Sequence, residues 1–218
     1  SLLGKLVIHY QLHGCCLYKL GTERHKKFFK GINEGTELGS FSMTEIEHGS
    51  NVRRLGTVAT YDKQTKEFVI QTTNPGATKF WIGNSAFYGT QTIVFAQLVT
   101  NDTNYGVHAF VVPLRSSSDL NKVYPGVTIC DLKAKQGWRG VDNAAIQYHG
   151  VRVPRENLLN RFGDVTPEGE YVSPIAKNAA RFGATLSALV FGRLLYILGP
   201  QRALEGSLTI AIRYAFQR

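Results

Sequence analysis

The periodicity of the apolar residues changes twice along this chain, and this change constrains the fold more than any other feature. Between Leu55 and Tyr148 short apolar runs alternate with polar residues, whereas the segments before and after show helical spacing. A period of two is typical of strands, and a spacing of three or four is typical of helices. The sequence therefore predicts an α+β fold, with a central antiparallel β-barrel or sandwich flanked by helices. The predicted strands are 57–61, 67–71, 93–99, 107–112, 127–130 and 144–148.

The flanking segments carry further helix signals. Residues 2–20 are mostly apolar and predict a helix. Thr22 is typical of the N-cap of a second helix, which Gly31 and Gly35 are expected to end. Residues 181–198 are apolar on almost all sides, so a helix here is expected to be buried among other helices.

Pro200 fits the first turn of a further helix. This last helical pattern reaches Arg218 without a Gly or Pro stop signal, and the chain starts in an apolar segment without an initiator methionine. We therefore expect the chain to be a piece of a longer protein.

The positive net charge of the chain is compatible with an anionic partner. The 218 residues include 25 Lys and Arg against 16 Asp and Glu, a formal charge of +9. Nucleic acid, an acidic membrane face or a phosphorylated small molecule would each suit such a charge. The basic residues are spread out, however, and the tight runs at 24–27 and 53–54 are typical of a solvated surface. The longest apolar run, 186–198, is too short to span a bilayer. Neither nucleic-acid binding nor membrane insertion is predicted.

Cysteine usage gives no support for a metal or disulfide site. Cys15, Cys16 and Cys130 are odd in number, and no CxxC spacing occurs. This pattern is typical of a reducing compartment, and no metal site is predicted.

A polar stretch at 39–51 lies between the first helical region and the first predicted strand. It places the hydroxyls of Ser42 and Thr44 on either side of Met43, and two carboxylates, an imidazole and a Gly-Ser-Asn turn follow. Polar loops between ordered elements commonly carry binding groups. Taken alone, the stretch could equally be a surface turn.

A second stretch, 79–84, contains the aromatic pair Phe80 and Trp81 beside Gly83. The pair can be ordinary core, because Phe and Trp bury large areas. It can also form a flat wall for a planar ring, with Gly83 allowing close approach of the backbone. The chain contains no GxGxxG, GxxxxGK[ST] or GxSxG motif, so neither a Rossmann cradle, a P-loop nor a hydrolase elbow is predicted.

Together, the two stretches resemble the acyl-CoA dehydrogenase and oxidase superfamily. The shared pattern is Met-Thr-Glu-x-x-x-Gly-Ser, followed about three dozen residues later by Lys-x-Trp-Ile. Segments that resemble the peroxisomal acyl-CoA oxidase branch recur in order over nearly the whole chain. They are Leu20–His25, Thr44–Asn51, Lys79–Asn84, Gly106–Pro113, Val151–Leu159 and Leu208–Tyr214.

The resemblance implies three domains. Residues 1–38 would end an N-terminal helical domain, 39–165 would form a middle β-barrel that binds flavin and acyl-CoA, and 166–218 would begin a C-terminal helical domain. It also implies FAD as cofactor, acyl-CoA and O2 as substrates, a homodimer in the full-length protein and a peroxisomal location. The implied reaction oxidises acyl-CoA to trans-2-enoyl-CoA with release of H2O2, the first step of peroxisomal fatty acid β-oxidation.

The resemblance also implies roles for individual residues. Thr44 matches a position that contacts the flavin, with its hydroxyl and backbone N–H as suitable donors. Met43 would pack near it, and Trp81 with Ile82 would lie against the flavin ring.

The resemblance also implies roles for Gly83 and Ser50. Gly83 matches a second flavin contact, where similar dehydrogenases usually carry Thr or Ser. We hypothesise that the missing side chain leaves space through which O2 reaches the flavin. Ser50 matches a position near the acyl-CoA chain. Arg53 or Arg54 could meet the phosphates of CoA, although a solvated position is the simpler interpretation.

No catalytic residue is assigned within the chain. The general base of this family is a Glu that is expected beyond Arg218, and Glu45 is not given that role because it belongs to the loop motif. The 218 residues alone are therefore expected to be inactive. The alternatives are a dehydrogenase that passes electrons to a carrier protein, a truncated noncatalytic product that keeps the fold, and a basic barrel that binds nucleic acid in a salt-dependent manner.

Overall fold

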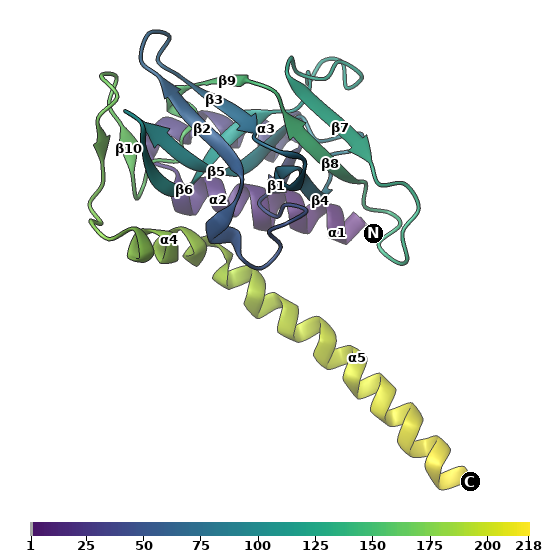
Figure 1. The fold of residues 1–218 in the computed structure, drawn as a ribbon. Coiled ribbons are helices and arrows are strands. Elements are labelled where there is room, and N and C mark those ends of the chain that lie inside the picture. The colour runs from purple at the N-terminus through teal and green to yellow at the C-terminus, as the bar shows by residue number, and fades with distance from the viewer. Residues whose placement is uncertain (1) are drawn as a thin grey trace.

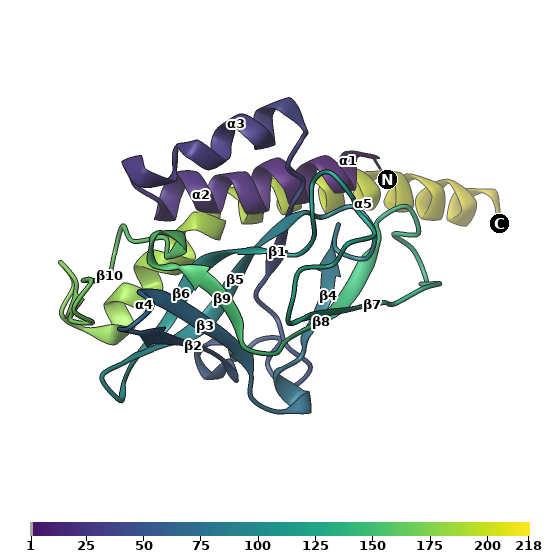
Figure 2. The same ribbon diagram turned by 90° about the horizontal axis from the view of Figure 1, so that it is seen from above.

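The computed structural model describes residues 2–218, whose main body has three layers (Figure 1 and Figure 2). Helices from the N-terminal part cover one face of a curled six-stranded sheet, and a three-stranded sheet packs against its other face. A long C-terminal helix projects away from this body (Figure 1).

The N-terminal helical region agrees with the prediction, except at one glycine. Residues 2–20 form one uninterrupted helical run whose middle is a π-helix. The next helix ends at Gly35, which adopts φ 69° as expected for a glycine C-cap. Gly31 lies inside that helix, so its predicted role as a helix end is wrong. The helices are α1 (Leu2–Leu6), η1 (Val7–Gly14), α2 (Cys15–Leu20), η2 (Glu23–His25), α3 (Lys27–Glu34), η3 (Val52–Arg54), η4 (Pro75–Ala77), η5 (Arg155–Asn157), α4 (Asn178–Leu186), η6 (Ser187–Leu189) and α5 (Val190–Gln217).

All the predicted strands are confirmed, as β2, β3, β5, β6, β7 and β8. The strands β1, β4, β9, β10 and β11 lie outside those predictions, because they are short or rich in polar and glycine residues. The strands are β1 (Gly39–Ser42), β2 (Thr57–Asp62), β3 (Glu67–Thr72), β4 (Lys79–Gly83), β5 (Gln91–Thr100), β6 (Thr103–Pro113), β7 (Val127–Asp131), β8 (Asn143–Tyr148), β9 (Val151–Pro154), β10 (Asp164–Val165) and β11 (Tyr171–Val172).

Strand β5 is the centre of the six-stranded sheet. Its antiparallel partner β6 runs along one edge, and β1 and β2 both pair parallel to its other edge. Ser42 of β1 pairs with Val94, and Val58 of β2 pairs with Gln97, so β1 and β2 follow one another along the same edge. We call the residues between them, 43–56, the excursion loop. The prediction of an antiparallel sheet is therefore wrong for β1 and β2, because the chain returns from this loop in its original direction.

Two apolar cores hold the layers together, and β5 contributes to both. Its side chains Val94, Ala96 and Leu98 face the three-stranded sheet, which consists of β4, β8 and β7. Ile93 and Phe95 face the helices on the opposite side. Burial on both faces explains why this strand reads as a nearly continuous apolar run. Each fully buried side chain of this size contributes about 1.5–3 kcal/mol.

The C-terminal helix differs from the prediction in two ways. A single helix, α5, runs through Pro200, so the prediction that Pro200 begins a new helix is wrong. The apolar side chains of Leu194, Ile197 and Leu204 are more than half exposed, because this part of the helix projects from the body (Figure 1). The expected burial among other helices is confirmed for Ala188 of η6, which packs with Leu17 and Leu20 of α2, but not for the exposed side chains of α5 named above. No helix in the described range has both the length and the apolar character needed to cross a membrane.

Candidate functional site

The excursion loop leaves the large sheet and pairs with β4 of the small sheet. Glu45 and Lys79 form an antiparallel bridge, and the Phe80 N–H donates to the Thr44 carbonyl at 3.0 Å. The Thr44 hydroxyl donates in turn to the Phe80 carbonyl at 2.9 Å. The two stretches that the sequence analysis singled out therefore lie side by side, and Thr44 is adjacent to the segment that carries Trp81.

Trp81 is held on the surface by an irregularity in β4. The register of β4 shifts between Lys79 and Ile82, and Trp81 adopts φ 64°, in the left-handed region that non-glycine residues seldom occupy. Its side chain is 52% exposed, and Asn143 Nδ2 donates to its carbonyl at 3.2 Å. An exposed indole in a strained conformation is not ordinary core, and it offers a flat face to a ligand.

Thr44 presents one unoccupied donor. Its hydroxyl proton is engaged by Phe80, whereas its backbone N–H makes no hydrogen bond with any residue in the range 2–218. A donor that is free at a partly exposed position can serve a ligand's oxygen or ring nitrogen. The structure therefore favours the backbone N–H of Thr44, more than its hydroxyl, as the donating group of this site.

Beneath Thr44 lies a buried ion pair. Glu45 Oε1 and Lys79 Nζ are 3.0 Å apart, and both side chains are fully buried. Burial alone would raise the pKa of Glu45, but the Lys79 ammonium and the donors from Thr57 and Gly56 hold that pKa below its usual range. Burial lowers the pKa of Lys79 to about 8, against the attraction of Glu45. A carboxylate that is ionised, buried and fully engaged cannot act as a general base on a ligand.

Two predicted contact residues, Met43 and Ile82, are buried in different cores. Met43 packs on the helical side of the large sheet, and Ile82 packs between the two sheets. Their side chains are 5% and 2% exposed. They support the surface that Thr44 and Trp81 form, and any direct contact with a ligand would come from their backbone.

Gly83 is explained by close packing of the N-terminal helix. A Cβ at this position would lie 2.4 Å from Cδ1 of Ile8, in η1, and 3.3 Å from Val141. The place that a side chain would take is occupied by Ile8, so the structure shows no open space at Gly83, and the hypothesis that this position governs access of O2 stays a prediction. The glycine allows η1 and β4 to approach one another closely, and a Cβ here would require the terminal methyl of Ile8 to shift.

Ser50 lies on the exposed part of the excursion loop, and no backbone hydrogen bond within residues 2–218 joins it to Thr44 or Trp81. Arg53, further along the same loop, lines a cavity of about 280 Å³ together with Arg181 and Phe182 of α4. The Arg53 guanidinium lies 5.1 Å from the centre of the Phe182 ring. The guanidinium of Arg53 is thus positioned at this cavity, beside the excursion loop.

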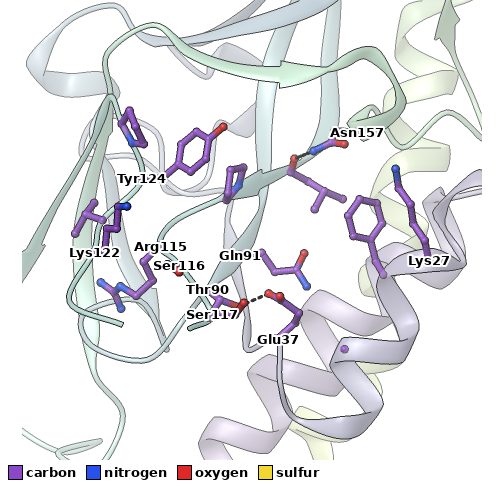
Figure 3. Close-up of a pocket in the computed structure, with 16 residues that line it drawn as sticks. Lys27, Glu37, Thr90, Gln91, Arg115, Ser116, Ser117, Lys122, Tyr124 and Asn157 are labelled. Atoms are coloured by element: carbon purple, nitrogen blue, oxygen red, sulfur yellow. Dashed lines mark hydrogen bonds between the residues drawn. The ribbon is translucent and has the colours of Figure 1, made fainter. Parts of the chain in front are cut away.

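A larger hollow, of about 800 Å³, lies between α3 and the segment that follows β6 (Figure 3). The Thr90 hydroxyl donates to Glu37 at 2.7 Å at its floor, and Gln91 lies beside this pair (Figure 3). None of the predicted site residues lines this hollow. Within residues 2–218 no group of three or more His, Cys, Asp or Glu side chains is placed to hold a metal ion.

The sequence analysis assigned no role to Lys79 or Thr57, although Lys79 is part of the motif that carries the resemblance. A lysine within an otherwise aromatic and apolar strand is the signal that could have indicated a buried partner for Glu45.

The comparisons with known proteins agree with the resemblance. Residues 40–151 match the family model described as the acyl-CoA dehydrogenase middle domain. Acyl-coenzyme A oxidase 2, peroxisomal, from Arabidopsis thaliana is 47% identical over 225 residues, which cover all of this chain and 32% of that protein. The chain thus spans about a third of the length of the curated relatives it matches.

Solved structures give the same result. Acyl-CoA oxidase 1 of Arabidopsis thaliana matches with a TM-score of 0.78 and 35% identity, covering 84% of this chain and 28% of that chain. Acyl-CoA oxidase-2 of Caenorhabditis elegans, bound with FAD, ascaroside-CoA and ATP, matches with a TM-score of 0.78 and 32% identity, covering 85% and 27%. The chain belongs to the acyl-CoA dehydrogenase and oxidase superfamily, and residues 40–151 are its middle domain.

Proposed function

We propose that this chain is part of an FAD-dependent acyl-CoA oxidase, which oxidises acyl-CoA to trans-2-enoyl-CoA and reduces O2 to H2O2 in the first step of peroxisomal fatty acid β-oxidation. The observation that carries the proposal is that Thr44, with its free backbone N–H, pairs with Phe80, the neighbour of the exposed Trp81. A flat apolar face beside a hydrogen-bond donor suits the isoalloxazine ring of FAD. The peroxisomal names of the relatives support the location.

In this proposal FAD, when bound, accepts the hydride that leaves the substrate. The chain's own residues bind and orient: Thr44 donates its N–H to the flavin, Trp81 covers one face of the ring, and the Gly83 backbone lies beside it. Ser50 lies near the acyl-CoA chain, and Arg53 offers its charge to a phosphate of CoA.

The general base is proposed to be a Glu beyond Arg218, because Glu45 is locked in its ion pair. The whole enzyme is proposed to act as a homodimer. The proposed domain division is 1–38, 39–165 and 166–218. An acyl-CoA dehydrogenase that passes electrons to a carrier protein is the second candidate, since the family model is named for dehydrogenases.

Two assays on the longer protein that contains this chain separate the candidates. After loading with FAD, H2O2 formed from acyl-CoA in air is measured with a peroxidase-coupled dye, and enoyl-CoA is measured by chromatography. An oxidase forms both products in equal amounts with O2 as the only acceptor. A dehydrogenase forms enoyl-CoA only when an artificial electron carrier is added. The 218 residues alone are expected to form neither product, and turnover by them would contradict the placement of the base.

A further inference from the structure

The Lys79 ammonium is saturated by three acceptors, one from β5 and two from the start of the excursion loop. It donates to the Phe95 carbonyl of β5 at 2.7 Å, to the Met43 carbonyl at 3.0 Å and to Glu45 Oε1 at 3.0 Å. An ammonium has three protons, so every one of them is used. Lys79 therefore joins β4, β5 and the start of the excursion loop at one buried point.

Glu45 extends this network to the other end of the loop. Its carboxylate accepts from the Gly56 N–H at 2.7 Å, the Thr57 N–H at 3.0 Å and the Thr57 hydroxyl at 2.6 Å. Gly56 and Thr57 are where the chain rejoins β5 as β2. The pair thus fixes both the departure and the return of the excursion loop.

The contact with Met43 sets the direction of the Thr44 N–H. The Met43 carbonyl and the Thr44 N–H belong to the same planar trans peptide, so they point in opposite directions. Because Lys79 draws the carbonyl into the interior, the N–H must point away from it. The free donor of the site is therefore a consequence of the buried lysine.

We propose that Lys79 and Glu45 are positioning residues for the cofactor, which aim the Thr44 N–H at the flavin without touching it. This inference rests on the proposed function. Without Lys79 the Met43–Thr44 peptide can rotate, and the donor loses its fixed direction.

The test compares variants of the longer protein by the dissociation constant of FAD and by the shape of the bound flavin's visible absorption band. Lys79→Met is expected to weaken FAD binding by about tenfold and to broaden the band, since one aimed hydrogen bond is lost. Val153→Ala is the matched control. It removes a buried side chain from β9, at the opposite end of the sheet order from β1, and is expected to lower the melting temperature but leave FAD affinity and the band unchanged.

Thr57→Val is the milder variant, for the case in which Lys79→Met does not fold. It removes the shortest hydrogen bond to Glu45 while keeping the side-chain shape, and is expected to weaken FAD binding by about threefold. The inference is overturned if the variants that fold bind FAD as tightly as Val153→Ala and with the same band shape. If the unmodified protein binds no FAD at all, the proposed function itself falls, and that result is distinct from a difference among variants.

Discussion

At the scale of single residues, packing against the helix η1 accounts for Gly83, which the resemblance assigned as a flavin contact. Ile8 and Gly83 are far apart in the sequence, and their contact arises only when η1 lies across β4. A motif gives the residue type at a position but not the neighbour that requires it. The role of Gly83 beside a ligand stays a prediction, whereas its packing role follows directly from the structure.

Gly83→Thr tests this packing. The new side chain would overlap with Ile8, so the variant is expected to lose about 1–3 kcal/mol of unfolding free energy. The same substitution in an Ile8→Ala background should cost clearly less, because the overlap is removed. Urea unfolding of the four proteins gives the coupling energy between the two positions. Additive effects would contradict the contact.

Buried charges at the residue scale were the least predictable part of the site. Lysine is seldom buried, so Lys79 at 0% exposure could not be expected from its residue type. The proximity of Thr44 to the segment that carries Trp81, by contrast, agrees with what the resemblance implied, because pairing of the loop with β4 brings the two stretches together.

At the scale of elements, periodicity was sufficient for the long strands and insufficient for the short ones. The strands β5 and β6 are long and rich in apolar residues, and the sequence located both. The strand β1 reads Gly-Ser-Phe-Ser and carries no clear period. Its parallel pairing with β5 joins residues about 50 positions apart, such as Gly39 and Gln91, and no local pattern encodes such a partner.

The helix α5 offers a test at the same scale. Proline lacks the N–H that an interior helical residue donates, and it crowds the preceding turn. Pro200→Ala is therefore expected to stabilise the helix around this position, by up to about 3 kcal/mol. Hydrogen exchange measured by mass spectrometry should show slower exchange of the amides in the neighbouring turns. Ser207→Ala, at an exposed position of the same helix, is the control.

If the amides around Pro200 exchange at the same rate in the Ala variant, α5 is not continuous through this position. The alternative is then the two-helix arrangement that the sequence pattern suggested.

At the scale of the whole molecule, two buried histidines predict sensitivity to acid. Burial lowers the pKa of His13 and of His108 to about 4 each, below the ordinary value near 6.5. Both are neutral in the folded protein and become protonated on unfolding as the pH falls below about 6.5. The unfolding free energy should therefore decrease between about pH 6.5 and 4, by about 3 kcal/mol for each histidine.

Urea unfolding across this pH range measures the effect. In His13→Asn the amide can still donate to the Ser40 carbonyl, which His13 Nδ1 reaches at 2.9 Å, but it does not titrate. This variant should show a shallower dependence on pH than the unmodified protein. Glu45 has a folded-state pKa below its ordinary value of 4.5, so the stability that it contributes is lost only as the pH falls below that value. An unchanged slope in the variant would show that His13 is not the group responsible.

The course of the excursion loop has a consequence for the adaptability of the scaffold. It departs after the partner of Val94 and returns before the partner of Gln97, so its ends are separated by only about 10 Å along β5. A two-residue bridge between Ser42 and Val58, in place of residues 43–57, could span this gap and make β1 and β2 one uninterrupted strand. The excursion loop, which carries the proposed contact residue Thr44, is thus an insert in the large sheet, whereas Trp81 and Gly83 lie in β4 of the small sheet. Grafting a different insert between the same two points could change the chemistry of the molecule, provided that the graft brings its own counterion for Lys79.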